Sequence, residues 1–307
     1  MAVETGMTAH GDNLVATFQL EGRAVRGRMI RLGDTMNEIL GPHVYPLPLA
    51  RIVGEAVMLA ALVGNALKFD GRLILQANGD GPVRFVVAEY LTTGSVRGMA
   101  QYDAEAVATA LEQQPEGQSI LETLLGKGAF AMTIDQGSDM DQYQGVVALE
   151  GDSLSDCAEA YFSQSEQVET RIHLAVGEIW NEDTPKAWRG GGAMIQLIAA
   201  DESRGSAEDD WDHARALFET ISDAEILDPA LETSELVYRL FHEDGARLFE
   251  PVPLTRHCSC SRERLAAVLK SFTQDDIDHM MEDGQITMTC EYCKSEYRFS
   301  EAQIPNV

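Results

Sequence analysis

Four of the five cysteines in this 307-residue chain lie in its last fifty residues, and their spacing could support metal chemistry. They form a C-x-C pair at 258–260 and a C-x-x-C pair at 290–293. Structural zinc sites take four ligands in a tetrahedron, and close cysteine pairs from two loops commonly supply them. The spacing therefore predicts a site for one zinc ion. Its expected ligands are Cys258, Cys260, Cys290 and Cys293.

The residues between the two pairs predict the elements that would position them. Residues 261–272 place apolar residues on one side of a helix, and Thr273 is expected to cap a second helix. The alternating stretches 285–290 and 294–300 predict a hairpin. The C-x-x-C pair would then lie in the hairpin turn and meet the first pair, as in zinc ribbons.

Three other side chains could take part in this chemistry. His257 and His279 are metal-ligating types, but four thiolates already complete a tetrahedral shell, so we expect neither to bind. Cys157 lies in a helix expected within 153–167, where we interpret it as a small buried apolar residue. The alternative for Cys157 is an additional redox-active thiol.

The two pairs also predict how an oxidant would act. A zinc ion would join the two cysteine loops with an apparent binding free energy of roughly 10–16 kcal/mol, as in small zinc modules. Nearest-neighbour disulfides, Cys258–Cys260 and Cys290–Cys293, would close loops of only three or four residues. Each would contribute at most about 2 kcal/mol. Neither would join the two loops, so oxidation with this pairing should unfold the C-terminal domain.

Charge and composition exclude several classes of partner. The 23 Lys and Arg residues against 50 Asp and Glu residues leave a formal net charge of -27, which disfavours nucleic acid and membrane surfaces. The start of the chain has neither a basic nor an apolar leader region. We interpret the apolar stretch 47–69 as a buried core helix, because its uninterrupted apolar part is shorter than a membrane span. We therefore expect a cytoplasmic protein, in which paired cysteines bind metal or switch redox state.

The chain as a whole predicts an α+β fold in three parts. Residues 1–200 mix strand and helix signals as an N-terminal domain of hairpins and helices, with one hairpin over 72–90 and a helix over 193–200. Residues 201–250 form an acidic, amphipathic, helical linker, either a solvated connector or one that can come loose. Residues 251–307 form a small C-terminal zinc-binding domain.

These residues resemble the 33 kDa chaperonin family, the redox-regulated heat-shock holdases of the bacterial cytosol. The resemblance rests on CSCSRER at 258–264 and DGQITMTCEYCKSEYRF at 283–299. YFSQSEQ at 161–167, GGAMIQ at 191–196 and GDGPV at 79–83 match as well, so that it covers essentially the whole chain.

The resemblance implies an ATP-independent chaperone that is an inactive, zinc-bound monomer when reduced. Oxidants such as peroxide, particularly with heat, would expel zinc, form the two local disulfides, and unfold the C-terminal domain and linker. The active homodimer would bind unfolding client proteins and prevent their aggregation. Four apolar linker residues are candidates for client binding: Trp211, Leu217, Phe218 and Ile221.

Two functions of other classes fit part of the pattern. A zinc-ribbon adaptor for protein or nucleic acid would use the same cysteines, although the net charge argues against nucleic acid. A thiol-disulfide oxidoreductase would place C-x-x-C at a helix N-terminus, whereas here it lies between expected strands. The chain contains neither G-x-S-x-G nor H-E-x-x-H, and GDGPV lacks the lysine of a phosphate loop. We therefore expect no enzyme.

Overall fold

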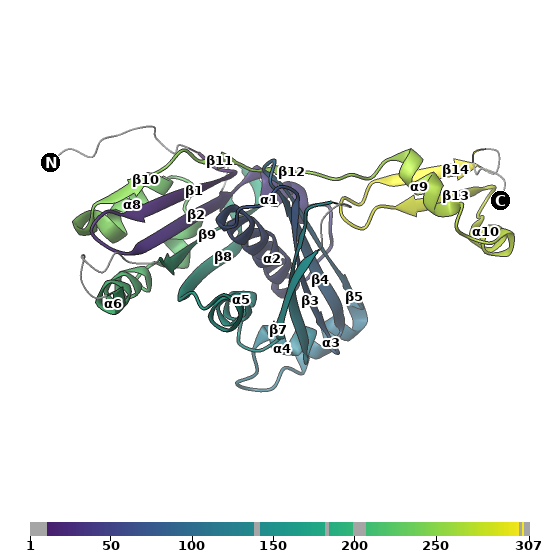
Figure 1. Ribbon diagram of the computed structural model, residues 1–307. Helices are drawn as coiled ribbons and strands as arrows, with labels where there is room; N and C mark the ends of the chain where they lie inside the picture. The colour runs from purple at the N-terminus through teal and green to yellow at the C-terminus, as the bar shows by residue number, and fades with distance from the viewer. Residues whose placement is uncertain (1–10, 138–141, 182–183, 199–206, 301–302, 304–307) are drawn as a thin grey trace. The chain divides into compact units, whose positions relative to one another are not determined.

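The computed structural model describes residues 11–137, 142–181, 184–198, 207–300 and 303. The chain divides into two compact units, Met1–Arg256 and His257–Val307 (Figure 1). The first unit contains two six-stranded sheets and the second a two-stranded sheet. The expected α+β mixture is confirmed.

The first sheet of the larger unit, sheet A, is antiparallel throughout. Five of its strands lie side by side in the order β10 (Ala246–Leu248), β1 (Leu14–Leu20), β2 (Val25–Leu32), β9 (Thr184–Leu197) and β8 (Thr170–Asn181). The sixth, β11 (Val252–Pro253), pairs with β1.

The second sheet, sheet B, is antiparallel except where its first strand joins. Its order is β12 (Thr255–Arg256), β5 (Ser95–Tyr102), β4 (Val83–Leu91), β3 (Arg72–Gly79), β6 (Gly128–Asp135) and β7 (Tyr143–Ala148). β3 and β4 pair directly, which confirms the hairpin expected over 72–90.

Helix α2 (Leu47–Ala66) lies between the two sheets (Figure 1). It begins after Pro46 with Pro48 in its first turn, where a missing N–H removes no intrahelical hydrogen bond. A Cβ atom at Gly64 would lie 2.2 Å from the Tyr90 ring, so glycine lets the ring of Tyr90 pack on the helix backbone. In the described residues α2 is the one helix apolar and long enough to cross a membrane, and 78% of its apolar window is buried inside the protein. The prediction of a buried core helix is confirmed.

The remaining helices of the larger unit are short. Those before the acidic segment are α1 (Asp34–Leu40), α3 (Ala104–Glu112), α4 (Ile120–Leu125) and α5 (Leu154–Tyr161), which continues as a π-helical turn over Phe162–Glu166. Those of the acidic segment are α6 (Ala207–Phe218), α7 (Asp223–Leu227) and α8 (Thr233–Phe241), with a 3₁₀ turn over His242–Asp244.

The helix expected over 193–200 is wrong, because residues 193–197 belong to strand β9, while 199 and 200 lie outside the described residues. Gly190, Gly191 and Gly192, which directly precede this stretch, pair with β2 on one side and β8 on the other. A Cβ atom at Gly190 would lie 2.6 Å from Met36, and one at Gly191 3.0 Å from Ile226. The glycines thus mark close packing on both faces of a central strand rather than a turn.

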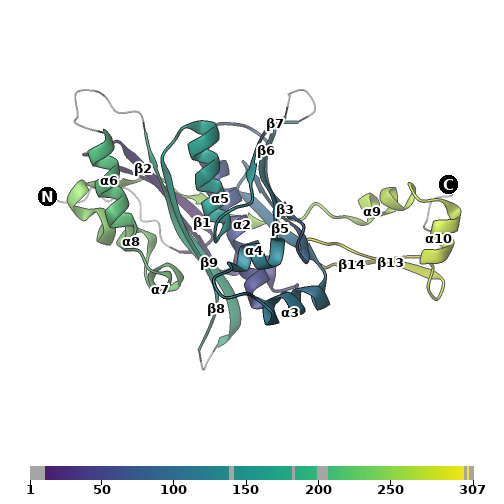
Figure 2. The ribbon, with the colours of Figure 1, turned by 90° about the horizontal axis from the view of Figure 1, so that it is seen from below.

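The acidic helices pack their apolar sides on sheet A (Figure 2). This interface joins Trp211, Ala214, Phe218, Ile221, Ile226, Leu231, Leu236, Val237, Leu240 and Phe241 to Phe18, Leu20, Val25, Met29, Ala175, Ala193 and Ile195. We call it the linker interface. Residues 201–206 lie outside the described residues, and the boundaries at 200 and 250 stay predictions.

Arginines on the first hairpin add polar ties to the linker interface. Arg31, a buried residue of β2, donates hydrogen bonds to the main-chain oxygens of Asp228 and Leu231. Arg23 donates to Asp210 at 3.1 Å and to Asp244 at 2.6 Å. Because the acidic helices repel one another's charge, these guanidinium contacts help to hold the segment in place.

The smaller unit contains α9 (Arg262–Leu269), α10 (Gln274–Met280), β13 (Gln285–Thr289) and β14 (Glu296–Ser300). Thr273 caps α10 in a capping box with Asp276, as expected for a second helix beginning there. β13 and β14 pair antiparallel, so the predicted hairpin is confirmed. The apolar core of this unit is small: its buried residues are Leu269, Ile277, Ile286 and Phe299.

Phe241→Ala tests the linker interface. The Phe241 ring is fully buried and lies 5.5 Å from the Phe18 ring, so truncation should destabilise docking of α6–α8 by about 3–5 kcal/mol. Amide hydrogen exchange in α8 should accelerate accordingly. Tyr238→Ala, on the exposed side of the same helix, should change stability by less than about 0.5 kcal/mol. Equal exchange in the two variants would contradict this packing.

Candidate metal centre

The C-x-x-C pair lies in the tight turn between β13 and β14. The Cys290 N–H donates to the Ser295 main-chain oxygen at 3.0 Å, and the Lys294 N–H donates to that of Cys290 at 2.8 Å. Lys294 has a φ of 54°, a left-handed conformation that closes the turn. This turn directs Cys290 and Cys293 to the same side.

The C-x-C pair lies directly before helix α9. The Ser261 hydroxyl accepts a hydrogen bond from the Arg264 N–H, which caps the helix and defines where the loop ends. The Arg264 guanidinium reaches back to the Ser259 main-chain oxygen at 2.9 Å. Arg264 therefore ties the residues on either side of Cys260 to the first turn of α9.

The four sulfur atoms meet in one cluster. All lie within 4.8 Å of one another, with Cys258 and Cys290 at 3.6 Å and Cys260 and Cys293 at 3.4 Å. A tetrahedral ion with metal–sulfur bonds of about 2.3 Å places its sulfurs about 3.8 Å apart. The cluster therefore fits a metal ion, and in the described residues this group consists of cysteines alone.

Burial and hydrogen bonds shift the pKa values of the cysteine thiols in different directions. Burial raises the pKa of Cys258 to about 12 and also raises that of Cys290. Burial opposes ionisation of Cys293 as well, but hydrogen bonds from the hydroxyl and N–H of Ser295 lower the pKa of this thiol to about 6. Cys293 is thus the most readily ionised of these three thiols, and binding of a metal cation would deprotonate the others.

The two histidines lie outside the cluster. His257 is exposed, and His279 is exposed on α10 with its Nδ1 at 2.6 Å from the Asp275 main-chain oxygen. Cys157 is fully buried in α5, and its thiol donates to the Glu150 main-chain oxygen at 3.2 Å. Burial raises its pKa to about 11, so the thiol resists ionisation. The expected buried position of Cys157 is confirmed.

Three of the four candidate client-binding residues belong to the linker interface in the larger unit, and the fourth, Leu217, packs against it. Trp211, Phe218 and Ile221 are 5%, 3% and 4% exposed, and Leu217 is partly buried. Their apolar side chains are therefore covered while the acidic helices are docked.

Sequence reasoning missed two hydroxyl groups beside the sulfurs. The Ser295 Oγ lies 3.3 Å from the Cys293 Sγ, and the Tyr297 Oη lies 3.3 Å from the Cys260 Sγ. Ser295 follows Cys293 by two residues, so its proximity could have been found from local spacing. Tyr297 reaches Cys260 across 37 residues, and only the folded hairpin brings the two together.

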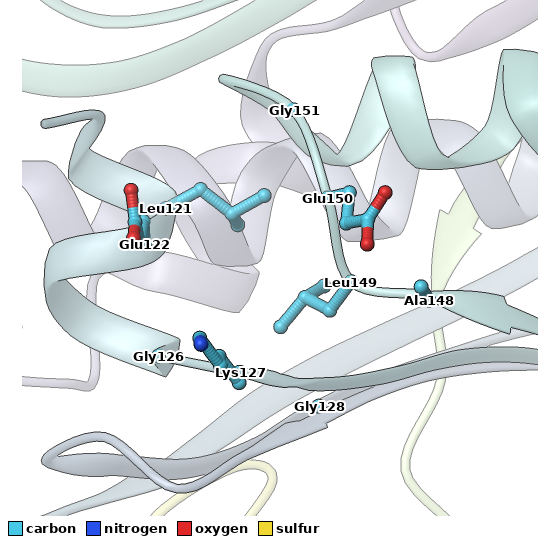
Figure 3. A pocket seen from close by; sticks show the side chains of 9 residues that line it. All are labelled: Leu121, Glu122, Gly126, Lys127, Gly128, Ala148, Leu149, Glu150 and Gly151. Carbon is cyan, nitrogen blue, oxygen red and sulfur yellow. The ribbon is translucent and has the colours of Figure 1, made fainter.

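A hollow elsewhere in the larger unit carries different residues. It has a volume of about 380 Å³ and lies between α4 and the segment that follows β7 (Figure 3). Its lining is mainly glycine and leucine, with Glu122, Lys127 and Glu150 as its charged members. Its lining contains neither histidine nor cysteine, so it does not resemble the cysteine cluster.

Comparison of the sequence with known proteins gives matches over nearly the whole chain. The model of the Hsp33 protein family matches residues 12–300. A 33 kDa chaperonin from Caulobacter vibrioides (strain NA1000 / CB15N) is 49% identical over 303 residues, covering 97% of each chain. A 33 kDa chaperonin from Enterobacter sp. (strain 638) is 36% identical over 293 residues, covering 94% of this chain and 93% of that protein.

A solved structure shares the fold. The crystal structure of the 33 kDa chaperonin (heat shock protein 33 homolog) from Thermotoga maritima has a TM-score of 0.76 and 22% sequence identity, covering 95% of this chain and 96% of that one. The fold, the cysteine cluster, and the family and sequence matches over nearly the whole chain lead to one conclusion: this chain belongs to the Hsp33 family of heat-shock chaperones.

Proposed function

We propose that this protein is a redox-regulated, ATP-independent holdase of the cytoplasm, and not an enzyme. Membership of a chaperone family supports binding of unfolding client proteins. The observation that carries the regulation is the cluster of four cysteines from two separate loops. In the proposed resting state the protein is reduced, zinc-bound, monomeric and inactive.

The four thiolates would hold one zinc ion, which supplies a cross-link between the loop at 258–260 and the turn at 290–293. The short distances between sulfurs of different loops support this role. A unit of about fifty residues with four buried apolar residues in its core needs such a link, because small cores seldom offset the conformational entropy of folding.

Oxidation removes the ligands. In each pair two thiolates lose two electrons and form one disulfide, while one molecule of peroxide takes up those electrons and two protons and leaves as two waters. We propose the pairs Cys258–Cys260 and Cys290–Cys293, which are nearest neighbours in sequence. Pairing across the loops would instead preserve the link and keep the unit folded. Disulfide mapping by mass spectrometry separates the two cases.

Loss of the C-terminal fold is proposed to free the acidic helices. The chain between α8 and Arg256 is held to the sheets by β10, β11 and β12, strands of only three, two and two residues. Such short pairings open easily once the chain beyond them is unfolded. Release would uncover the apolar face of sheet A and the candidate client-binding residues Trp211, Leu217, Phe218 and Ile221. We propose that the active form is a homodimer.

The central experiment measures aggregation of a heat-unfolding client by light scattering. The protein would be added either reduced and zinc-loaded or pretreated with peroxide at elevated temperature, with zinc release read by a chromogenic chelator. We expect aggregation to be suppressed only after oxidation, in step with zinc release. Zinc release without suppression would show that the cluster regulates something other than client binding.

Trp211 provides a reading of linker release in the same protein. A variant with Trp180→Phe and Trp188→Phe retains only Trp211, which is 5% exposed in the docked helix α6. Oxidation should shift its fluorescence emission to longer wavelength, because the indole becomes exposed to water. Unchanged emission in a protein that suppresses aggregation would show that clients bind without release of α6.

Cys290→Ser tests the ligand assignment. Loss of one of four thiolates should weaken zinc binding by more than about 100-fold, the upper range for outer-shell changes, and destabilise the C-terminal unit. Chelator competition and thermal unfolding measure the two effects. Cys157→Ser should leave the zinc stoichiometry unchanged, because Cys157 lies in α5. Full zinc binding by Cys290→Ser would overturn the four-ligand assignment.

A further inference from the structure

We propose that Tyr297 is a positioning residue that controls how readily the cysteine cluster is oxidised, through a hydrogen bond from its hydroxyl to the Cys260 sulfur. This inference rests on the proposed function as a zinc-bound redox switch. It adds a residue that is not a ligand and assigns it to regulation of the same site.

The contact connects the two segments that the metal would connect. Tyr297 lies in β14 opposite Met288 of β13, and its Oη is 3.3 Å from the Cys260 Sγ in the other loop. Its ring packs against the small core of the unit, which holds the hydroxyl in position. A metal-bound thiolate has no proton, so the tyrosine must be the donor in this hydrogen bond.

The partners of the other three sulfurs come from their own loops. The Cys258 sulfur receives the main-chain N–H of Cys260, and the Cys293 sulfur has both the N–H and the hydroxyl of Ser295 as partners. The Cys290 sulfur receives the N–H groups of Tyr292 and Cys293. The main-chain bonds follow from the shape of each loop, and Ser295 lies only two residues from Cys293 in the same turn. The Tyr297 hydroxyl instead reaches a sulfur of the other loop, and removal of one oxygen atom abolishes this contact.

The hydrogen bond should matter for both binding and oxidation. Four thiolates around a divalent cation carry a net charge of two minus, and each donor stabilises that charge. A thiolate that accepts a hydrogen bond is also a weaker nucleophile toward peroxide, because the shared lone pair is less available. Cys260 is only half-buried, whereas Cys290 and Cys293 are buried. Tyr297 therefore restrains a sulfur that burial does not fully protect.

Tyr297→Phe in the full-length, zinc-loaded protein is the direct test. It keeps the ring in the core and removes only the hydroxyl. We expect zinc affinity, measured by chelator competition, to fall about 10-fold, the lower range for outer-shell partners. The rate of zinc release at a fixed peroxide concentration should rise several-fold. With Co²⁺ in place of zinc, the sulfur-to-metal charge-transfer band should move to lower energy, because the sulfur holds its electrons less tightly.

The matched control is Tyr143→Phe, which removes a hydroxyl bonded to Glu166 at 3.2 Å in the larger unit. It should leave all three readings unchanged. Lower thermal stability of Tyr297→Phe without a shift of the cobalt band would mean a packing role only, and would overturn the inference. So would wild-type values in all three readings. Failure of the wild-type protein to bind zinc, or to lose it on oxidation, would instead overturn the proposed function.

Discussion

The structure depends on one constraint: the C-terminal unit must hold two cysteine loops together with very little apolar core. Leu269, Ile277, Ile286 and Phe299 are the buried residues of that core. A cation bound by the four thiolates would supply what the core lacks, because it would link segments that are about thirty residues apart. The same thiolates are oxidisable, so in the proposed switch stability and redox sensitivity would reside in the same four atoms.

The acidic segment is held to the rest of its unit mainly through one apolar face of its helices. Its helices are amphipathic, and their apolar sides complete the linker interface with sheet A. Their like charges oppose docking, and Arg23 and Arg31 compensate for part of that repulsion. A segment stabilised mainly by one apolar face would detach as a unit if its anchorage failed, whereas the largely buried helix α2 would not. This contrast within one unit is consistent with the release of α6–α8 that we propose.

Several elements could be predicted from sequence because their signals are local. Helix α2 is apolar over most of its surface, the β3–β4 hairpin surrounds a glycine-rich turn, and Thr273 lies three residues before its capping-box partner. The helix expected over 193–200 failed for a long-range reason. A short apolar run is compatible with either a helix or a buried strand. Here the pairing with the neighbouring strands, and the packing of Met36 and Ile226 against the glycines, make it part of strand β9.

The cysteine spacing by itself determined that a four-sulfur site could form, since each pair is a short local motif and ligand chemistry depends on residue type. Tertiary structure decided the surroundings of the sulfurs. The meeting of Tyr297 with Cys260 depends on the register of β14 and the placement of a loop 37 residues away. Likewise, the contact of Arg31 with the carbonyl of Leu231 spans 200 residues. Such contacts leave no local pattern, because they arise from packing between elements and not from the periodicity of any one of them.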